Sequence, residues 1–356
     1  MRGTVDGRRR LPAQEERYGL GHRMRAWLRE PPSRQGRHVD PVEQSVADPA
    51  RWPPLRRTVY TSPEMTLFRA GLVAPSGGDE RTGVLDDLAV FYDLDPAECL
   101  ARCLEWEAAS VAEWNREDRS SDEARLRFYQ STQSWAFDLL WWAYLQAAGH
   151  GEPQAAIAAY WVSRRLAGRR HLDFGSGAGT TAQLFSALGF ESTLADVSSS
   201  LLDFARFRIE RRGGQAAYRD LGISADLGGP YDVITAIDTL AHVPDIRTTA
   251  TTLWHALARG GFLVAGLDAR PPSPENAWHL QDDELECRYL LQRVGFRPEH
   301  RLGSMLIAYR RVDPSSIGHR CRAVPEWLAF GSPRSRALQQ EAKSAARAAI
   351  GRVRRW

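Results

Sequence analysis

Lysine and cysteine are both scarce in this sequence of 356 residues. Lys343 is the only lysine, so arginine supplies nearly all of the positive charge, which indicates a compositional bias rather than a selected binding patch. The four cysteines are Cys99, Cys103, Cys287 and Cys321. Cys99 and Cys103 lie four residues apart, but no second pair completes the spacing of a zinc site. We therefore expect structural thiols, no metal centre and no oxidising compartment.

Long hydrophobic runs are missing as well. A membrane-spanning helix needs roughly 18 consecutive apolar residues, and the nearest candidate, residues 135–148, is shorter and contains Asp138 and Gln146. The arginine-rich N-terminus has no apolar segment of the kind found in secretory signals. The sequence thus predicts a cytoplasmic protein without a membrane span.

The positive charge is concentrated at the two ends of the chain. Residues 1–38 contain ten arginines against four acidic residues, and residues 334–356 contain seven basic residues against Glu341. Basic ends are able to contact nucleic acid or anionic lipid. We expect solvated tails instead: a disordered segment over 1–55 and a partly helical tail over 313–356. Nucleic acid is not the expected partner.

The segment 56–150 has the pattern of a helical region that caps the rest of the chain. Asp95-Pro96 is a typical helix start. A polar stretch over residues 115–122 is expected to separate the helix that begins there from the next one. The following segment, Glu123 to Ala148, is apolar on more than one face, which predicts a helix buried between others.

From residue 151 to 312, short apolar runs alternate with helical stretches. Strands are predicted over residues 171–175, 192–197, 216–221, 231–237 and 261–267, with two more over 298–301 and 305–310. Helices are predicted over 180–188, 201–211, 248–258 and 282–294. Strands that alternate with helices of this length form a parallel sheet covered on both faces. The predicted fold class is α/β: a doubly wound, mostly parallel seven-stranded sheet with an N-terminal helical cap.

A glycine-rich turn follows the first of these strands, in the string His171-Leu172-Asp173-Phe174-Gly175-Ser176-Gly177-Ala178-Gly179. Glycine allows a sharp turn and lets a ligand approach the backbone. Asp173 precedes the turn, where a carboxylate suits a cationic ligand better than a pyrophosphate. Asp196 ends the second strand, where it is placed to accept hydrogen bonds from ribose hydroxyls, and Asp220 ends the third, where it is placed to bind an adenine amino group. The three carboxylates predict a ligand site at the carboxyl ends of the strands.

With these motifs the sequence resembles the class I S-adenosylmethionine-dependent methyltransferases, from about residue 170 to 265 and more loosely to 310. The string 173–179 is similar to motif I of the family, Tyr231 to Asp238 to its fourth strand, and Leu257 to Leu263 to its helix–Gly-Gly–strand step. The resemblance implies a Rossmann-type domain with S-adenosylmethionine as its cofactor. The residues that it assigns to the cofactor are Asp173, Gly175, Ser176, Gly177, Gly179, Asp196, Val197, Asp220, Leu221 and Ile237.

Candidate catalytic residues follow the fourth and fifth strands. Methyl transfer from a sulfonium is an in-line displacement, in which the enzyme positions the acceptor and, where needed, removes its proton. Asp238, His242 and His279 are the candidates, and the first two share a face if their turn is helical. For each of the two histidines, a packing role is the alternative to catalysis. Some relatives hold a metal here with two glutamates and a histidine, whereas this chain has Asp238, Ala241 and His242, so we expect no metal.

The substrate is predicted to be a small molecule. The loop after the fourth strand lacks the Asn/Asp-Pro-Pro-aromatic string of enzymes that methylate exocyclic base nitrogens, and no Pro-Cys pair offers a nucleophile for a pyrimidine carbon. Tyr129 and Trp135 flank a polar run in the cap and are the candidate substrate-lining residues, with ordinary helix packing as the alternative.

Two other functions remain open at this point. An NAD(P)-dependent oxidoreductase shares the glycine-rich turn and Asp196, but favours an apolar residue in place of Asp173. A catalytically inactive methyltransferase-like protein would bind a partner and would have no need of the carboxylates at 173, 196 and 220. The acceptor atom and the oligomeric state are not predicted.

Overall fold

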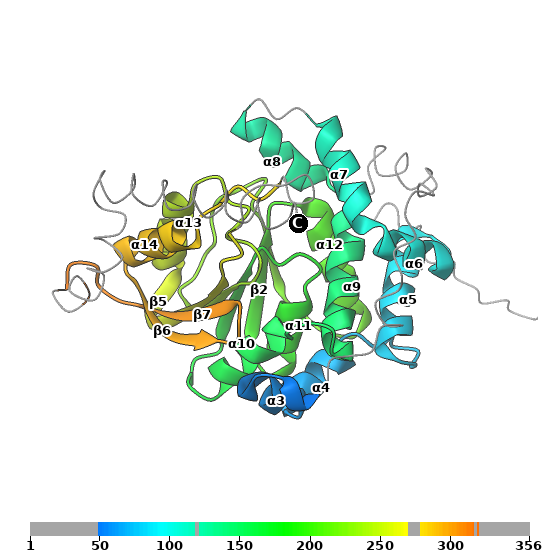
Figure 1. The fold of residues 1–356 in the computed structure, drawn as a ribbon, viewed down its shortest axis with the longest axis horizontal. Helices are drawn as coiled ribbons and strands as arrows, with labels where there is room; N and C mark the ends of the chain where they lie inside the picture. Colours follow the sequence, from blue (N-terminus) through cyan, green and yellow to red (C-terminus); the bar gives the residue numbers. More distant parts are fainter. Residues whose placement is uncertain (1–48, 118–120, 270–277, 317–318, 320–356) are drawn as a thin grey trace, which may run out of the picture.

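The strands predicted from the alternating pattern form one seven-stranded sheet in the order β3-β2-β1-β4-β5-β7-β6 (Figure 1). The computed structural model describes residues 49–117, 121–269, 278–316 and 319, so the predictions for 1–48 and for residues 320–356, Cys321 included, lie outside the described part of the chain. The strands are β1 (Arg170–Phe174), β2 (Glu191–Asp196), β3 (Ala217–Asp220), β4 (Tyr231–Ala236), β5 (Leu257–Gly266), β6 (Phe296–Leu302) and β7 (Leu306–Arg311).

The sheet is parallel from β3 to β5, and β7 is antiparallel to both β5 and β6. Strands β2 and β4 are buried along almost their whole length, as expected for parallel strands covered on both faces. The helices that cover the sheet are α10 (Gln154–Ser163), α11 (Thr180–Ala187), α12 (Ser199–Arg211), α13 (Ile246–Ala256) and α14 (Glu284–Val294). Helices α13 and α14 pack together on one face, and α10, α11 and α12 lie on the other. The predicted fold class is confirmed.

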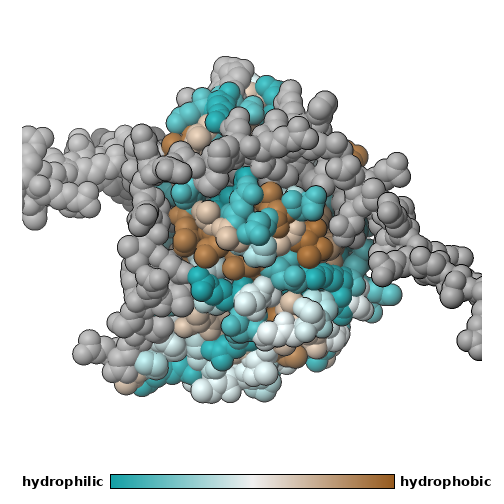
Figure 2. Space-filling view, turned by 90° about the vertical axis from the view of Figure 1, so that its right-hand side faces the viewer, coloured by the Kyte–Doolittle hydropathy of each residue, from teal (hydrophilic) through white to brown (hydrophobic). Residues whose placement is uncertain are grey.

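The N-terminal helices form the predicted cap and lie beside α11 and α12 (Figure 1). They are η2 (Pro49–Arg51), α3 (Pro54–Tyr60), α4 (Pro63–Ala70), α5 (Glu80–Tyr92), α6 (Pro96–Leu104), α7 (Trp106–Arg116), α8 (Asp122–Ser131) and α9 (Ser134–Ala148). One hydrophobic cluster continues from Val59 and Phe137 in the cap to Val233 in the sheet. The face that carries α5 and α6 mixes apolar and polar side chains (Figure 2). None of the described helices is long and apolar enough to cross a membrane.

Two helix predictions in the cap are wrong. The helix that starts after Asp95 ends at Leu104, well before the predicted polar break, and α7 begins directly after Glu105. The helix predicted over Glu123 to Ala148 is divided into α8 and α9.

A half-buried carboxylate starts helix α9. Glu113 on α7 accepts hydrogen bonds from the hydroxyl of Thr132 at 2.6 Å and from the backbone N–H groups of Gln133 and Ser134, both at 3.3 Å. The first N–H groups of a helix have no partner inside it, and a negative charge is favourable at that end. The polar run that separates Tyr129 from Trp135 in the sequence is therefore the junction of two helices.

A buried ion cluster joins the cap to the sheet. Asp87 on α5 has no solvent-exposed surface and accepts from Arg208 at 3.0 Å, Arg211 at 2.9 Å and Arg212 at 2.8 Å, all at the end of α12. Arg208 is equally buried and also donates to the carbonyl of Ala178 at 2.7 Å. Because Ala178 belongs to the glycine-rich turn, Arg208 links the cap to the predicted ligand site.

Candidate active site

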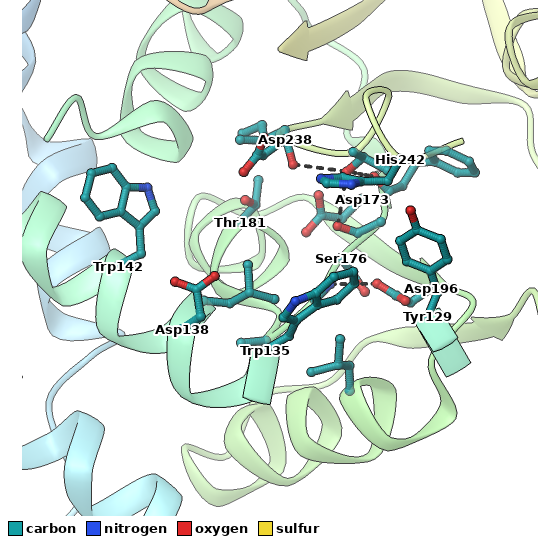
Figure 3. Close-up of a pocket in the computed structure, with 18 of the residues that line it drawn as sticks. Tyr129, Trp135, Asp138, Trp142, Asp173, Ser176, Thr181, Asp196, Asp238 and His242 are labelled. Carbon is teal, nitrogen blue, oxygen red and sulfur yellow. Dashed lines mark hydrogen bonds between the residues drawn. The ribbon is translucent and has the colours of Figure 1, made fainter. Parts of the chain in front are cut away.

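A cavity of about 500 Å³ lies between the carboxyl ends of the parallel strands and the cap (Figure 3). This volume is within the range of small-molecule sites. Most of the predicted site residues line it: Tyr129, Trp135, Asp173, Gly175, Ser176, Gly177, Asp196, Val197, Leu221, Ile237, Asp238, His242 and His279. Gly179 and Asp220 lie behind the wall.

The three glycines of the turn are required by the backbone and by neighbouring side chains. Gly175, Gly177 and Gly179 all have φ between 50° and 74°, a conformation that disfavours residues with a Cβ. A Cβ at Gly175 would lie 2.2 Å from Thr239, and one at Gly177 would lie 2.7 Å from Leu139. The sequence predicted that a ligand lies close to these glycines. At the Cβ positions, the close neighbours are instead side chains of the protein itself.

Asp173 reaches the cavity wall but is bonded to the protein through both oxygens. It accepts from the Thr235 hydroxyl at 2.8 Å and from the backbone N–H of Ala182 at 3.1 Å, so it joins β1 to β4 and α11. Burial raises the pKa of Asp173 to about 7. Thr235 also bonds His171 at 2.8 Å, and burial lowers the pKa of that histidine to about 3. Because the Thr235 hydroxyl donates its proton to Asp173, it accepts from a neutral His171.

Asp196 faces the cavity and at the same time holds the glycine-rich turn. Its carboxylate accepts from the backbone N–H groups of Gly177 and Ser198, both at 2.9 Å, and burial raises its pKa. Asp220 accepts instead from the Ser199 hydroxyl at 2.5 Å and fixes the loop that carries Leu221. Of the two carboxylates, only Asp196 is open to a ligand in the cavity.

Two histidines lie together in the cavity wall, His242 from the turn after β4 and His279 from the segment before α14. The rings of His242 and His279 are 4.7 Å apart between centroids. Nδ1 of His242 donates to the Trp278 carbonyl at 3.4 Å, and Nδ1 of His279 donates to the Asp268 carbonyl at 3.1 Å, because a carbonyl only accepts. Each ring therefore keeps Nε2 as its basic atom. Burial, reinforced by His279, lowers the pKa of His242 against the opposing effect of Asp238.

Asp238 and His242 do not share a helical face. The chain forms a turn here, and Asp238 has a φ of 54°, which is unusual for a residue with a side chain. Left-handed residues of this kind cluster at functional sites. The turn brings both side chains to the cavity from the end of β4 (Figure 3).

The two candidate substrate residues have different surroundings. Tyr129 is buried and donates its hydroxyl to the Trp278 carbonyl at 2.5 Å, so it fixes the segment that carries His279. Trp135 is half-buried, with its ring 5.4 Å from that of Tyr129 and 5.9 Å from that of His242. Trp135 thus has an open face in the cavity. Tyr129 also lines the cavity, but it has in addition the packing role that was the alternative to substrate contact.

Asp138 is a cavity residue that the sequence analysis missed. It follows Trp135 by one turn of α9 and lies between Trp135 and Trp142 along the wall (Figure 3). Burial raises the pKa of its carboxyl to about 8, and the negative charges of Asp238 and Glu107 add to the effect. The available signal was one acidic residue at helical spacing from two tryptophans in an otherwise apolar helix.

The charges of the cavity suit a cation better than a phosphate. Among the described residues that line it, the acidic side chains are Glu107, Asp138, Asp173, Asp196 and Asp238, and Arg125 is the one arginine. Ser176 adds a buried hydroxyl oxygen with no partner in the described part of the protein. These groups fit S-adenosylmethionine, which carries positive charge, hydroxyl groups and no phosphate. In the described ranges no three His, Cys, Asp or Glu side chains are arranged to hold a metal.

Comparison with known proteins adds independent findings. A family model described as a methyltransferase domain matches residues 172–263. A ubiquinone biosynthesis O-methyltransferase of Xanthomonas axonopodis pv. citri is 31% identical over 37% of this chain and 58% of its own length. The enzyme of the same name from Azotobacter vinelandii is 32% identical over 46% of this chain and 67% of its own length. The N-methyltransferase NodS of Bradyrhizobium japonicum, solved with S-adenosyl-L-homocysteine, has a TM-score of 0.38 at 19% identity, over 46% of this chain and 87% of its own.

The chain spans 58% and 45% of the length of the Xanthomonas axonopodis relative and of its namesake from Aromatoleum aromaticum. The match with the Azotobacter enzyme reaches two thirds of that protein.

Proposed function

Because the chain belongs to the class I S-adenosylmethionine-dependent methyltransferases, we propose that it transfers a methyl group from this cofactor to a small-molecule acceptor by in-line displacement. The observation that carries the proposal is that one cavity wall combines two sets of residues: the glycine-rich turn with its acidic side chains, which we call the acidic end, and the tryptophans with the two histidines, which we call the aromatic end. A cavity of this form holds a cationic donor and a planar acceptor side by side.

The acidic end is the proposed cofactor site. S-adenosylmethionine, when bound, supplies a methyl group on a positively charged sulfur, which makes the methyl group electrophilic. We assign the ribose hydroxyls to Asp196, because its carboxylate faces the cavity and is held in place by two backbone N–H groups. Ser176 offers its unpaired hydroxyl to the same ligand. Gly179 and Asp220 act from behind the wall, by shaping the turn and the neighbouring loop.

The aromatic end is the proposed acceptor site. Trp135 presents a ring face there, and Tyr129 and Trp278 close the wall beside it. Aromatic walls favour a planar acceptor. The curated relatives bear the name of an O-methyltransferase, which supports a hydroxyl oxygen as the acceptor atom. The acceptor that we propose is therefore a hydroxyl group on a planar small molecule.

His242 is the proposed general base. Its Nδ1 proton is bonded to a carbonyl, so Nε2 is free to accept the proton of the acceptor hydroxyl. The lowered pKa keeps the ring neutral at neutral pH, which a base requires. Asp238 opposes the effect of burial and stabilises the imidazolium that forms when the proton is transferred.

Calorimetric titration with S-adenosylmethionine and S-adenosylhomocysteine tests the cofactor. We expect binding of both ligands, and a loss of about 10- to 100-fold in affinity for Asp196→Asn, because charge-assisted hydrogen bonds to the ribose are removed. Asp226→Asn is the matched control, since Asp226 is an exposed carboxylate outside the cavity. A folded protein that binds neither ligand would refute the proposed function.

Single-turnover kinetics test the base. His242→Gln should reduce methyl transfer by about 10²- to 10⁴-fold, the usual contribution of a general base, without changing cofactor affinity. His279→Gln should raise the pKa of His242, because the neighbouring His279 lowers it. The acidic limb of the pH–rate profile should then move to higher pH. An unchanged rate in His242→Gln would assign His242 to packing.

A further inference from the structure

Asp138 is a half-buried acid in the cavity wall, without a hydrogen-bond partner among the described residues. Burial and two negative charges act on it, and no described residue donates a hydrogen bond to its carboxylate. Figure 3 shows this carboxylate on α9, on the side of the helix that faces the cavity. An unpaired carboxyl in such a place is costly to ionise. A ligand that brings a positive charge removes that cost.

The neighbours of Asp138 place it at the boundary of the two ends of the cavity. Leu139, the next residue, is the side chain that a Cβ at Gly177 would meet, so this part of α9 lies against the cofactor turn. Trp135, one turn earlier, lines the aromatic end. A small cation held at this boundary would contact Asp138 from the cap and Asp238 from the sheet.

We propose that the Asp138 carboxylate is the counter-ion of an alkylammonium group bound in the cavity. The inference rests on the proposed function and deepens it, because it makes the helical cap part of the binding chemistry. Two sources supply this group: the α-ammonium of the cofactor, or an amine on the acceptor. The contact between α9 and the cofactor turn favours the first source.

The pH dependence of binding follows from the charge of Asp138. Without a ligand, Asp138 is largely protonated at pH 7, since its pKa is raised to about 8. A bound ammonium favours the carboxylate, so the proton leaves to the buffer and affinity rises between pH 6 and pH 7. The other titratable or charged side chains of the wall are Glu107, Arg125, Tyr129, Asp173, Asp196, Asp238, His242 and His279. Their contribution is removed by comparing the protein with its Asp138→Asn variant.

The first experiment is calorimetry with S-adenosylmethionine and S-adenosylhomocysteine at pH 7 in phosphate and in Tris. The difference in heat between the buffers counts the protons released. We expect the unmodified protein to release about 0.9 proton more than Asp138→Asn, the protonated fraction at a pKa of about 8. Both ligands keep the α-ammonium, so the variant should lose about 10- to 100-fold in affinity for each.

The second experiment tests the acceptor as the source. Tyramine and p-cresol share a phenol ring, but only tyramine carries an ammonium group. If the acceptor supplies the cation, the unmodified protein binds tyramine more tightly than p-cresol, and Asp138→Asn loses this preference while it keeps its affinity for both cofactor ligands. Quenching of tryptophan fluorescence reports the binding, because Trp135 and Trp142 adjoin Asp138.

Two further variants control for folding and for a general effect of charge. Asp138→Asn removes a half-buried acid that has no partner in the described part of the protein, so its melting temperature should not fall. Asp138→Glu should restore part of the affinity and of the proton release. Asp203→Asn should behave as the unmodified protein, because the pKa of Asp203 is also raised by burial but this residue does not line the cavity.

The outcomes separate the inference from the proposed function. Unchanged affinities for all four ligands and unchanged proton release in Asp138→Asn would overturn the inference. If the unmodified protein binds neither cofactor ligand, the proposed function fails. The tyramine comparison then decides the role of Asp138 by itself, and an equal affinity for tyramine and p-cresol would overturn that role too.

Discussion

Replacing Asp87 should be among the most destabilising single changes in the described part of the protein. One carboxylate there pairs with three arginines, and both Asp87 and Arg208 are fully buried. Burial lowers the pKa of Arg208 to about 10 even though Asp87 is in contact with it. Removing the carboxylate leaves a buried guanidinium without a counter-charge, which costs about 3–5 kcal/mol.

The expected loss is a large part of the stability of the protein. Domains are stable by about 5–15 kcal/mol, and each kcal/mol shifts the melting temperature of a protein of this size by roughly 2–4 °C. Asp87→Asn should therefore melt roughly 6–20 °C below the unmodified protein. Circular dichroism during heating, together with urea unfolding at pH 7, measures the change.

The neighbouring residue provides a matched control. Asp86 bonds Arg211 at 2.6 Å, but its side chain is 38% exposed. A solvent-exposed pair contributes about 0–1 kcal/mol and is screened by salt. Asp86→Asn should thus cost little, and less at high ionic strength, whereas the loss in Asp87→Asn should persist in salt. Equal losses in the two variants would refute the reasoning.

Three further predictions concern the interior and the cofactor turn. His171 is neutral in the folded protein, with a pKa lowered to about 3 against about 6.5 in the unfolded chain. Its contribution to the free energy of unfolding is complete above pH 6.5 and falls by about 2 kcal/mol by pH 5. In urea unfolding, His171→Gln should therefore lose less stability than the unmodified protein over that range. Gly175→Ala should abolish cofactor binding in calorimetry, since its Cβ would lie 2.2 Å from Thr239, while Gly260→Ala, with a similar φ but open space, should only lose about 1 kcal/mol. Tyr129→Phe removes one buried hydrogen bond and should lower the free energy of unfolding by about 1 kcal/mol at unchanged cofactor affinity.

The sheet was predictable from sequence because its periodicity is a local property. Each strand of β1 to β5 is a short apolar run between helices, and parallel strands of this kind are buried on both faces whatever surrounds them. The glycine-rich turn was predictable for the same reason, since positive φ values at alternate positions require glycine. The divided helix was not, because the carboxylate that starts α9 comes from Glu113 on another helix.

The site was predictable only where its residues follow a strand. Asp196 ends β2 and Asp238 follows β4, so the topology alone brings them to one edge of the sheet. Asp138 belongs to the cap, and its place in the cavity depends on how α9 packs against the turn. No periodicity encodes that contact. From the sequence, Asp138 was therefore interpreted only as an interruption of a hydrophobic run and not as a cavity residue.

The glycine-rich turn bonds both halves of the protein, which couples ligand binding to stability. Arg208 of the buried cluster donates to Ala178, Asp196 accepts from Gly177, and Leu139 of the cap packs on Gly177. A ligand at 100 times its Kd stabilises the folded state by about 2.7 kcal/mol. Because the turn is bonded to the cap, part of that energy is used to hold α9 against the sheet. Asp87→Asn should accordingly weaken cofactor binding as well, although Asp87 lies outside the cavity wall.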